Sequence, residues 1–172
     1  MVQMNATELK NLQAPLKEKY RTEPKAAIIT LKAEGKIGEG ISCSIETGRA
    51  ITEAGLHPAT GGTGLLACSG DMLLEALVAC AGVTLRAVAT AIGIEIKNGT
   101  VRAEGDLDFR GTLGVSKEAP VGFISIRLFF NLDTEATADQ MESLAKLTER
   151  YCVVYQTLLK GVIIDTTYNF PG

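Results

Sequence analysis

The longest apolar stretch of the chain is residues 71–93, DMLLEALVACAGVTLRAVATAIG, and it predicts a helix. It contains no proline, and Glu75 and Arg86 are its only charged residues after the first position. Its apolar residues cover every face, which is typical of a helix at the centre of a core or at an oligomer interface. The stretch is also long enough to cross a bilayer, but each charge near the bilayer centre would cost roughly 2.5 to 3.5 kcal/mol. We therefore expect a buried central helix with Cys80 at its middle, and no membrane span.

Before this helix, the pattern predicts a peripheral helix and a small sheet. Apolar residues recur at helical spacing over residues 6–20, and Asn5 with Glu8 has the spacing of a capping box. From residue 26 onward, apolar and polar positions alternate in short runs. These runs predict a three-stranded meander with its first turn around Gly35, Gly38 and Gly40.

A glycine-rich segment, residues 55–70, leads into the central helix. It lacks the Gly-Lys-Ser/Thr sequence of a phosphate-binding loop, so a plain entrance loop is favoured. Ser69 is the expected N-cap of the helix, and Cys68 lies just outside. Because a helix N-terminus lowers the pKa of a nearby thiol, Cys68 competes with Cys80 as a reactive cysteine. His57, the only histidine, is more often solvated in such a loop than part of a site.

After the central helix, two alternating segments predict an antiparallel hairpin, followed by a helix and a strand. The inward face of the hairpin is expected to contain Val101, Ala103, Leu107 and Phe109 from one strand, and Ile124, Ile126, Leu128, Phe130 and Leu132 from the other. Thr137 and Gln140 form a second capping box, which opens a helix whose apolar period continues through Cys152 to Leu159. The residues VIIDTTYNF predict a last strand. This order of elements indicates the α+β class.

Length and composition narrow the function classes. The chain has 172 residues, 46% of them hydrophobic, which is sufficient for a single domain over residues 1–172 without metal or disulfide support. A net charge of -3 and the absence of tryptophan argue against nucleic-acid binding. The cysteines, at positions 43, 68, 80 and 152, form no Cys-x-x-Cys pair and do not predict a zinc site. The N-terminal residues MVQMNATELKNLQ lack the apolar stretch of a signal peptide, so we expect a cytoplasmic protein with reduced thiols.

Two segments resemble the OsmC/Ohr family. SGDMLLEALVACAGVTL resembles the ELL-x-A-A-L-A-x-C helix of that family, and ERYCVVYQTLLKGV resembles its Y-C-P-V segment. The resemblance extends over about residues 26–168 and leaves residues 1–24 as a helical extension. It implies an OsmC-like fold, with antiparallel sheets around a long buried helix. It also implies an intertwined homodimer whose active sites lie near the subunit interface.

The chemistry implied by this resemblance is the reduction of organic hydroperoxides or hydrogen peroxide. Cys80 matches the reactive cysteine of the family and Cys152 the resolving cysteine. The first forms a sulfenic acid, the second traps it as a disulfide, and a dithiol reduces that disulfide. The implied partners are therefore a small hydroperoxide and a dithiol reductant, and no metal or flavin is needed.

The sequence departs from the family pattern around the reactive thiol. Active members support the thiolate with an arginine from the N-terminal strands and a glutamate ten residues before the cysteine. Here the second position is Gly70, next to Asp71, and no arginine lies in the predicted strands before Arg49. Lys36, Arg49 or the partner's Arg86 are the candidate substitutes for the missing cation.

A further departure lies beside Cys152, where Val153 and Tyr155 replace the usual proline and serine. Without the proline, the last helix is expected to continue through Cys152. Glu75 and Arg86 lie on one face of the central helix but about three turns apart, so we expect them to pair across a dimer interface rather than act in catalysis. An alternative hypothesis remains, in which a non-enzymatic dimer binds a small apolar ligand and the cysteines are structural.

Overall fold

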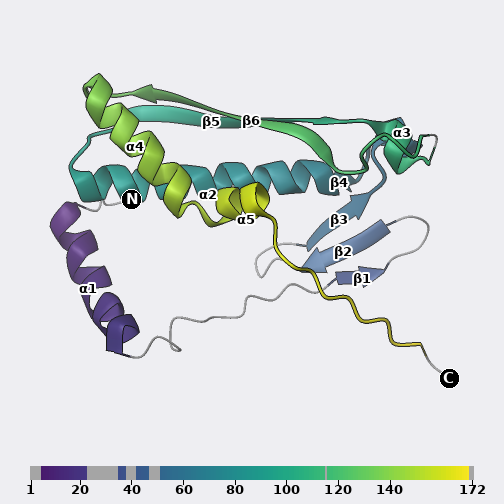
Figure 1. Cartoon of the computed structure of the whole chain (residues 1–172), viewed down its shortest axis with the longest axis horizontal. Helices are drawn as coiled ribbons and strands as arrows, with labels where there is room; N and C mark the ends of the chain where they lie inside the picture. Colours follow the sequence, from purple (N-terminus) through teal and green to yellow (C-terminus); the bar gives the residue numbers. More distant parts are fainter. Residues whose placement is uncertain (1–4, 23–34, 38–41, 47–50, 115, 171–172) are drawn as a thin grey trace.

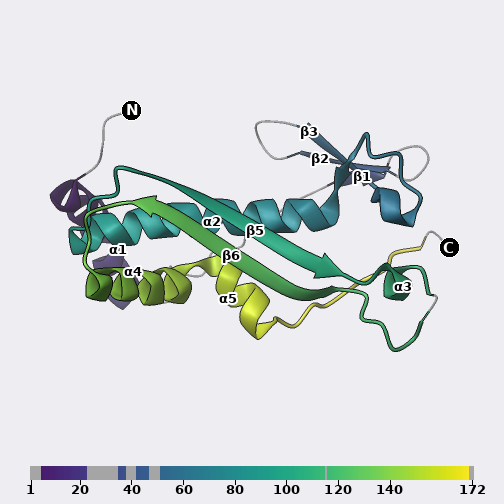
Figure 2. The same cartoon turned by 90° about the horizontal axis from the view of Figure 1, so that it is seen from above.

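A computed structural model of the chain describes residues 5–22, 35–37, 42–46, 51–114 and 116–170. Helix α2 (Ser69–Ile92) lies at its centre (Figure 1). A two-stranded hairpin lies across α2, and the last two helices run beside it (Figure 2). The predicted α+β architecture, with antiparallel pairing around a long central helix, is confirmed.

Helix α2 buries a single stripe of residues at every fourth position. These residues are Leu77, Ala81, Leu85 and Ala89. Its N-cap is Cys68, one residue before the predicted Ser69, and Cys68 makes no side-chain capping bond. Its C-terminus is capped by Gly93, whose φ of 75° is in the left-handed region that glycine adopts freely. By length and composition α2 could cross a membrane, but here it packs against the hairpin and the last helices as a core helix.

Strands β5 (Asn98–Leu107) and β6 (Phe123–Asp133) form the predicted antiparallel hairpin. Two residues expected on its inward face are elsewhere: Phe109 begins the short helix α3 (Phe109–Thr112), and Ile124 is 58% exposed. Phe109 lies beyond the end of β5, and the exposure of Ile124 follows from a register shift between Asp106 and Leu107. Past this irregularity the alternation of faces reverses, and Phe123 packs against Gly105 instead. A Cβ at Gly105 would lie 2.4 Å from the Phe123 ring, so only glycine fits there.

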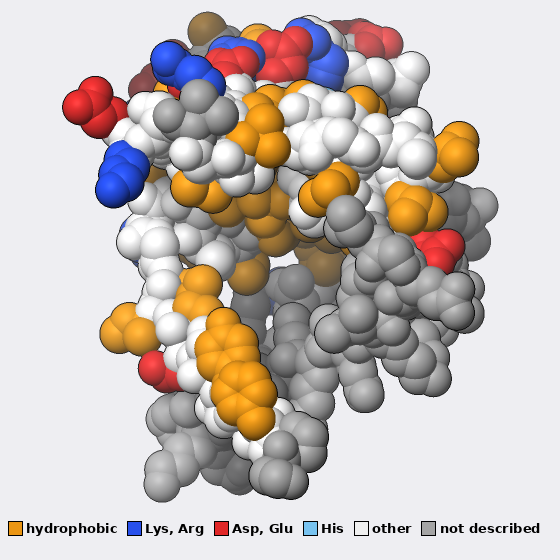
Figure 3. Space-filling model, turned by 90° about the vertical axis from the view of Figure 1, so that its right-hand side faces the viewer, with side chains coloured by type: hydrophobic (Ala, Val, Ile, Leu, Met, Phe, Trp, Pro, Cys, Tyr) orange, Lys and Arg blue, Asp and Glu red, His pale blue; other side chains and the backbone are white. Residues whose placement is uncertain are grey.

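The outer face of the hairpin is charged. Arg127 pairs with both Asp106 and Glu104, and Arg102 also pairs with Glu104. Hydrogen bonds from Arg127 and Ser125 hold the pKa of Asp106 far below its usual range. Charged side chains gather along the top of Figure 3, above hydrophobic groups. One side of the hairpin therefore meets water, while the other covers the helices.

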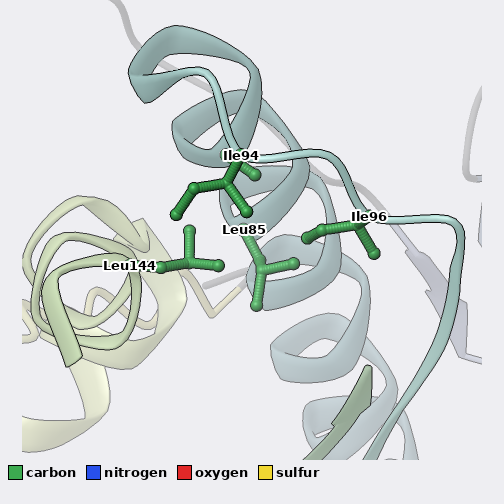
Figure 4. Packing of buried hydrophobic residues seen from close by; sticks show 5 residues of the cluster. Leu85, Ile94, Ile96 and Leu144 are labelled. Carbon is green, nitrogen blue, oxygen red and sulfur yellow. The ribbon is translucent and has the colours of Figure 1, made fainter. Parts of the chain in front are cut away.

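A second part of the hydrophobic core lies at the C-terminal end of α2, where α2, the segment after it and a later helix meet. Leu85, Ile94, Ile96 and Leu144 pack together, each at most 7% exposed (Figure 4). Leu144 belongs to helix α4 (Ala138–Tyr151), which begins at the predicted capping box of Thr137 and Gln140. This cluster joins α2, the segment after it and α4 into one packed unit.

The N-terminal part contains helix α1 (Ala6–Thr22) and a small sheet. The predicted capping box of α1 is present, since Asn5 and Glu8 exchange two hydrogen bonds of 2.9 Å. The sheet consists of four short strands: β1 (Gly35–Ile37), β2 (Ser42–Glu46), β3 (Ile51–Gly55) and β4 (Ala67–Cys68). The first three form an antiparallel meander, and β4 pairs with β3 in parallel. Of the three glycines of the predicted turn, Gly35 begins β1 instead, whereas Gly38 and Gly40 lie outside the described residues, as does the predicted first strand, residues 26–33.

The C-terminal part corrects two predictions. The helix expected to run through Cys152 is two helices, α4 and α5 (Val153–Lys160), separated by an extended Cys152 with φ -72° and ψ 108°. The residues VIIDTTYNF form no strand, because a strand needs a hydrogen-bonded neighbour and none lies beside residues 161–170 in the described chain. Several of their apolar side chains are exposed, including Ile163 at 91% and Phe170 at 83%.

Candidate active site

Two helices bring the side chains of Cys80 and Cys152 together. Cys80 is half-buried in the middle of α2, and Cys152 is 1% exposed at the junction of α4 and α5. Cys80 packs against the buried cluster that contains Cys152, and both thiols are free. This packing agrees with the close approach of the two cysteines, whose catalytic roles stay a prediction.

The break at Cys152 releases backbone donors next to the Cys80 sulfur. In a continuous helix, the N–H groups of Val153 and Val154 would donate to carbonyls four residues earlier. Here the side chain of Gln156 donates to one of these carbonyls, Glu149 O, at 2.8 Å. The backbone N–H groups of Val153 and Val154 instead act on the Cys80 thiol, whose pKa they lower.

The local environment favours the thiolate form of Cys80. Burial raises the pKa of its thiol, but hydrogen bonds outweigh this effect and leave the pKa below its ordinary value. The donors are the Val154 N–H, the Cys152 side chain, the Thr84 hydroxyl and the Val153 N–H. The two N–H groups belong to the first turn of α5, where the helix dipole also favours a negative charge.

Cys152 is perturbed in the opposite direction. Burial raises the pKa of its thiol, and the N–H groups of Tyr155 and Val154 offset this only in part. The hydrogen bond to Cys80 and the negative charge of Cys80 raise the pKa further. The two shifts have opposite directions, so Cys80 is the thiol of this pair that loses its proton more readily. A thiolate in contact with a thiol can attack an electrophile and then form a disulfide.

The family follows from the sequence around these helices. A model described as OsmC-like protein matches residues 62–167, more than half of the chain. The chain belongs to the OsmC family. No curated protein matches the sequence.

Solved structures of OsmC proteins share the fold. An OsmC-like protein from Mycoplasma pneumoniae is 15% identical, with a TM-score of 0.65 over 77% of this chain and 89% of that one. An organic hydroperoxide resistance protein from Elizabethkingia anophelis is 18% identical, with a TM-score of 0.62 over 78% and 91% of the two chains. An organic hydroperoxide resistance protein OsmC from Legionella pneumophila is also 18% identical, with a TM-score of 0.61 over 78% and 92%. At these identities the similarity concerns the fold.

The candidate supporting charges of this OsmC protein lie away from the two sulfurs. Arg86 Nη1 donates to the backbone carbonyl of Ile96 at 2.7 Å, which fixes the end of α2 rather than a thiolate. Glu75 and Asp71 are exposed on α2, and no ion pair joins Glu75 to Arg86 within the described chain. Their pairing across a dimer stays a prediction.

The remaining candidates are also separate from the Cys80 sulfur. His57 caps the short helix η2 (Pro58–Thr60), accepting from the Ala59 N–H at 3.0 Å, and stacks on Phe109. Lys36 lies in β1, and Arg49 is outside the described residues. Cys68, at the N-terminus of α2, precedes Cys80 by three helical turns, roughly 18 Å along the helix axis.

Three donors to Cys80 were not predicted from the sequence. Thr84 lies four residues after Cys80 on the same helix face, so this spacing could have predicted its contact with the Cys80 thiol. The N–H groups of Val153 and Val154 had no such signal, because they become available only through the helix break. Among the described residues, no group of His, Cys, Asp and Glu side chains could hold a metal ion.

A cavity of about 790 Å³ lies next to Cys152. Its wall is formed by α2, β6, α4 and α5, and it includes Cys152 and Tyr155. Cys80 is not part of this wall. Of the two cysteines, Cys152 alone therefore borders the cavity.

Proposed function

We propose that the protein is a thiol-dependent peroxidase that reduces organic hydroperoxides or hydrogen peroxide. Cys80 is the proposed nucleophile and Cys152 the proposed resolving cysteine. The observation that supports this assignment is the contact between a thiol of lowered pKa and a second thiol that retains its proton. The chain belongs to the OsmC family, and two of the similar structures described above are organic hydroperoxide resistance proteins. Both findings agree with a peroxidase function.

The proposed reaction has three steps. The Cys80 thiolate attacks one peroxide oxygen, an S–O bond forms, the O–O bond breaks, and the alkoxide leaves as the alcohol after taking a proton. The sulfur of Cys152 then attacks the Cys80 sulfenic acid, an S–S bond forms, and water leaves. Finally a dithiol reduces this disulfide by exchange and is itself oxidised to a disulfide. One hydroperoxide and one dithiol are thus converted into an alcohol, water and an oxidised dithiol.

In this proposal the first turn of α5 replaces the arginine-based support of the family. Val153 retains an N–H group that the usual proline would lack, and this group donates to Cys80 together with the Val154 N–H. Backbone donors at a helix N-terminus stabilise a thiolate without a cationic side chain. The valine at position 153 therefore compensates for the missing arginine and glutamate.

The decisive experiment uses the reduced protein with cumene hydroperoxide and dithiothreitol. Cys80→Ser should abolish peroxide consumption, whereas Cys152→Ser should allow one oxidation and then accumulate sulfinic acid at Cys80. Cys68→Ser is the matched control and should consume peroxide at the wild-type rate. Mass spectrometry after a stoichiometric pulse identifies each product. A wild-type Cys80 that remains a free thiol, or a Cys80→Ser variant that keeps its activity, would show that the peroxidase assignment is wrong.

We also propose that the protein acts as a homodimer in the cytoplasm, where reduced dithiols are available. The face of α2 that contains Cys80 also contains the exposed residues Ala76 and Val83, the latter 73% exposed. A second copy covering this apolar face would enclose Cys80 and exclude water. Sedimentation at low micromolar concentration should give a dimer. Val83→Glu should weaken this dimer. Leu65→Glu, at an 88% exposed position outside this face, is the control and should not weaken it. A stable wild-type monomer would contradict this assignment.

A further inference from the structure

The cavity beside Cys152 has the size and the wall of a small-molecule site. Its volume of about 790 Å³ lies within the usual range for ligand pockets, roughly 300 to 1,000 Å³. The wall is mainly hydrocarbon. It includes Leu77 and Leu85 of α2, Ile126 and Phe130 of β6, and Met141 and Leu144 of α4. Such a wall favours an occupant whose body is apolar.

One polar group in this wall lacks a partner. Thr148 of α4 is 3% exposed, and its Oγ1 makes no hydrogen bond in the described chain. Buried hydroxyl groups nearly always have a hydrogen-bond partner, because leaving one unsatisfied is unfavourable. Since Thr148 belongs to the cavity wall, a polar group of a bound molecule can supply the missing partner.

The charged side chains around the cavity indicate which kind of polar group a bound molecule carries. The only charged side chain in the wall is the exposed carboxylate of Glu149, and the wall contains no lysine, arginine or histidine from the described residues. A carboxylate on the bound molecule would lose its hydration without gaining a cation, and it would be repelled by Glu149. A neutral hydroxyl group has neither disadvantage.

We propose that this cavity binds a neutral amphiphile, with a hydrocarbon body and one hydroxyl-type group that hydrogen-bonds to Thr148. The site discriminates against the corresponding carboxylate. The proposal goes beyond the peroxidase function, because Cys80 does not line the cavity and no redox step is involved. Binding would place the apolar body between β6 and α4, next to Cys152.

The test compares two probes of equal chain length, 1-decanol and decanoate, at pH 8 with the reduced wild-type protein. Isothermal titration calorimetry should show decanol binding at least about tenfold more tightly than decanoate, since a buried uncompensated charge is costly. Thr148→Val keeps the shape but removes the hydroxyl, and it should weaken decanol binding about fivefold. Thr148→Ser should retain the binding. Thr157→Val, a matched threonine on the exposed face of α5, should change nothing.

Three results would overturn the proposal: no decanol binding by the wild type, equal affinity for decanoate, or unchanged affinity in Thr148→Val. The first would indicate that a second copy of the chain fills the cavity. If Thr148→Val does not fold, the decanol-to-decanoate ratio and the Thr148→Ser variant still decide. Neither probe contains a peroxide bond, so a failed peroxidase assay and a failed binding experiment are separate outcomes.

Discussion

Replacing Val153 with proline tests whether the first turn of α5 supports the Cys80 thiolate. The substitution deletes the Val153 N–H, one of the four donors to Cys80. It should leave the fold intact, because proline is well tolerated at the first position of a helix. The extended ψ of 108° at Cys152 suits a residue before proline, and the Val153 side chain is 70% exposed.

The size of the effect follows from the number of donors. A hydrogen bond to a charged group contributes about 1.5 to 3 kcal/mol. The lower end applies here, because Cys80 is half-buried and the three other donors remain. A loss of about 1.4 kcal/mol corresponds to about tenfold less thiolate below the midpoint of the titration. The variant should therefore need a higher pH for the same reactivity.

The assay is the pH dependence of Cys80 alkylation by iodoacetamide, followed by mass spectrometry of the peptide that contains Cys80. Val153→Pro should shift the rate profile to higher pH, with rates about tenfold lower on its rising part. Val153→Ala, which keeps the N–H, is the control and should superimpose on the wild type. If the proline profile also superimposes, or if alanine shifts it as far, the N–H group does not support the thiolate.

Two further substitutions test other contacts. Thr84→Val should slow Cys80 alkylation at neutral pH by several-fold while Thr84→Ser preserves it, because only the hydroxyl donates to the sulfur; equal rates in both would contradict that role. Leu144→Ala should lower the free energy of unfolding in urea by about 3 to 5 kcal/mol, since Leu144 is 1% exposed and borders a cavity that prevents collapse around the deletion. Leu65→Ala, at an 88% exposed position, should change it by less than about 0.5 kcal/mol, and a similar loss at both positions would refute the burial argument.

Features set by local sequence were predictable. The capping boxes at Asn5 and Thr137 depend on residues three positions apart, and the end of α2 depends on one glycine, Gly93. The pairing of β5 with β6 followed from alternation, because one face had to be apolar. The contact between Cys80 and Cys152 was expected from the family resemblance, since no local pattern relates residues on separate helices.

Features that depend on distant contacts were missed. The apolar period runs through Cys152 on both sides of the break, so periodicity alone indicates one helix. The break is compensated by hydrogen bonds from Val153 and Val154 to Cys80, on another helix. The predicted strand after Gly161 needs a neighbour that the described chain does not provide. In each case the deciding partner lies far away in the sequence.

The location of the buried residues has a consequence for folding. Every residue that is buried in the described chain lies between Leu77 and Cys152. This continuous segment contains α2, the hairpin and α4, and its two buried clusters join α2 to Leu144 and to Cys152. Such a segment is expected to behave as one cooperative unit, whereas α1 and the tail after Lys160 open at a lower free energy. In native-state hydrogen exchange, the amides of α2 around Cys80 should therefore outlast those of α1, and the two sulfurs should stay aligned while the ends of the chain fluctuate.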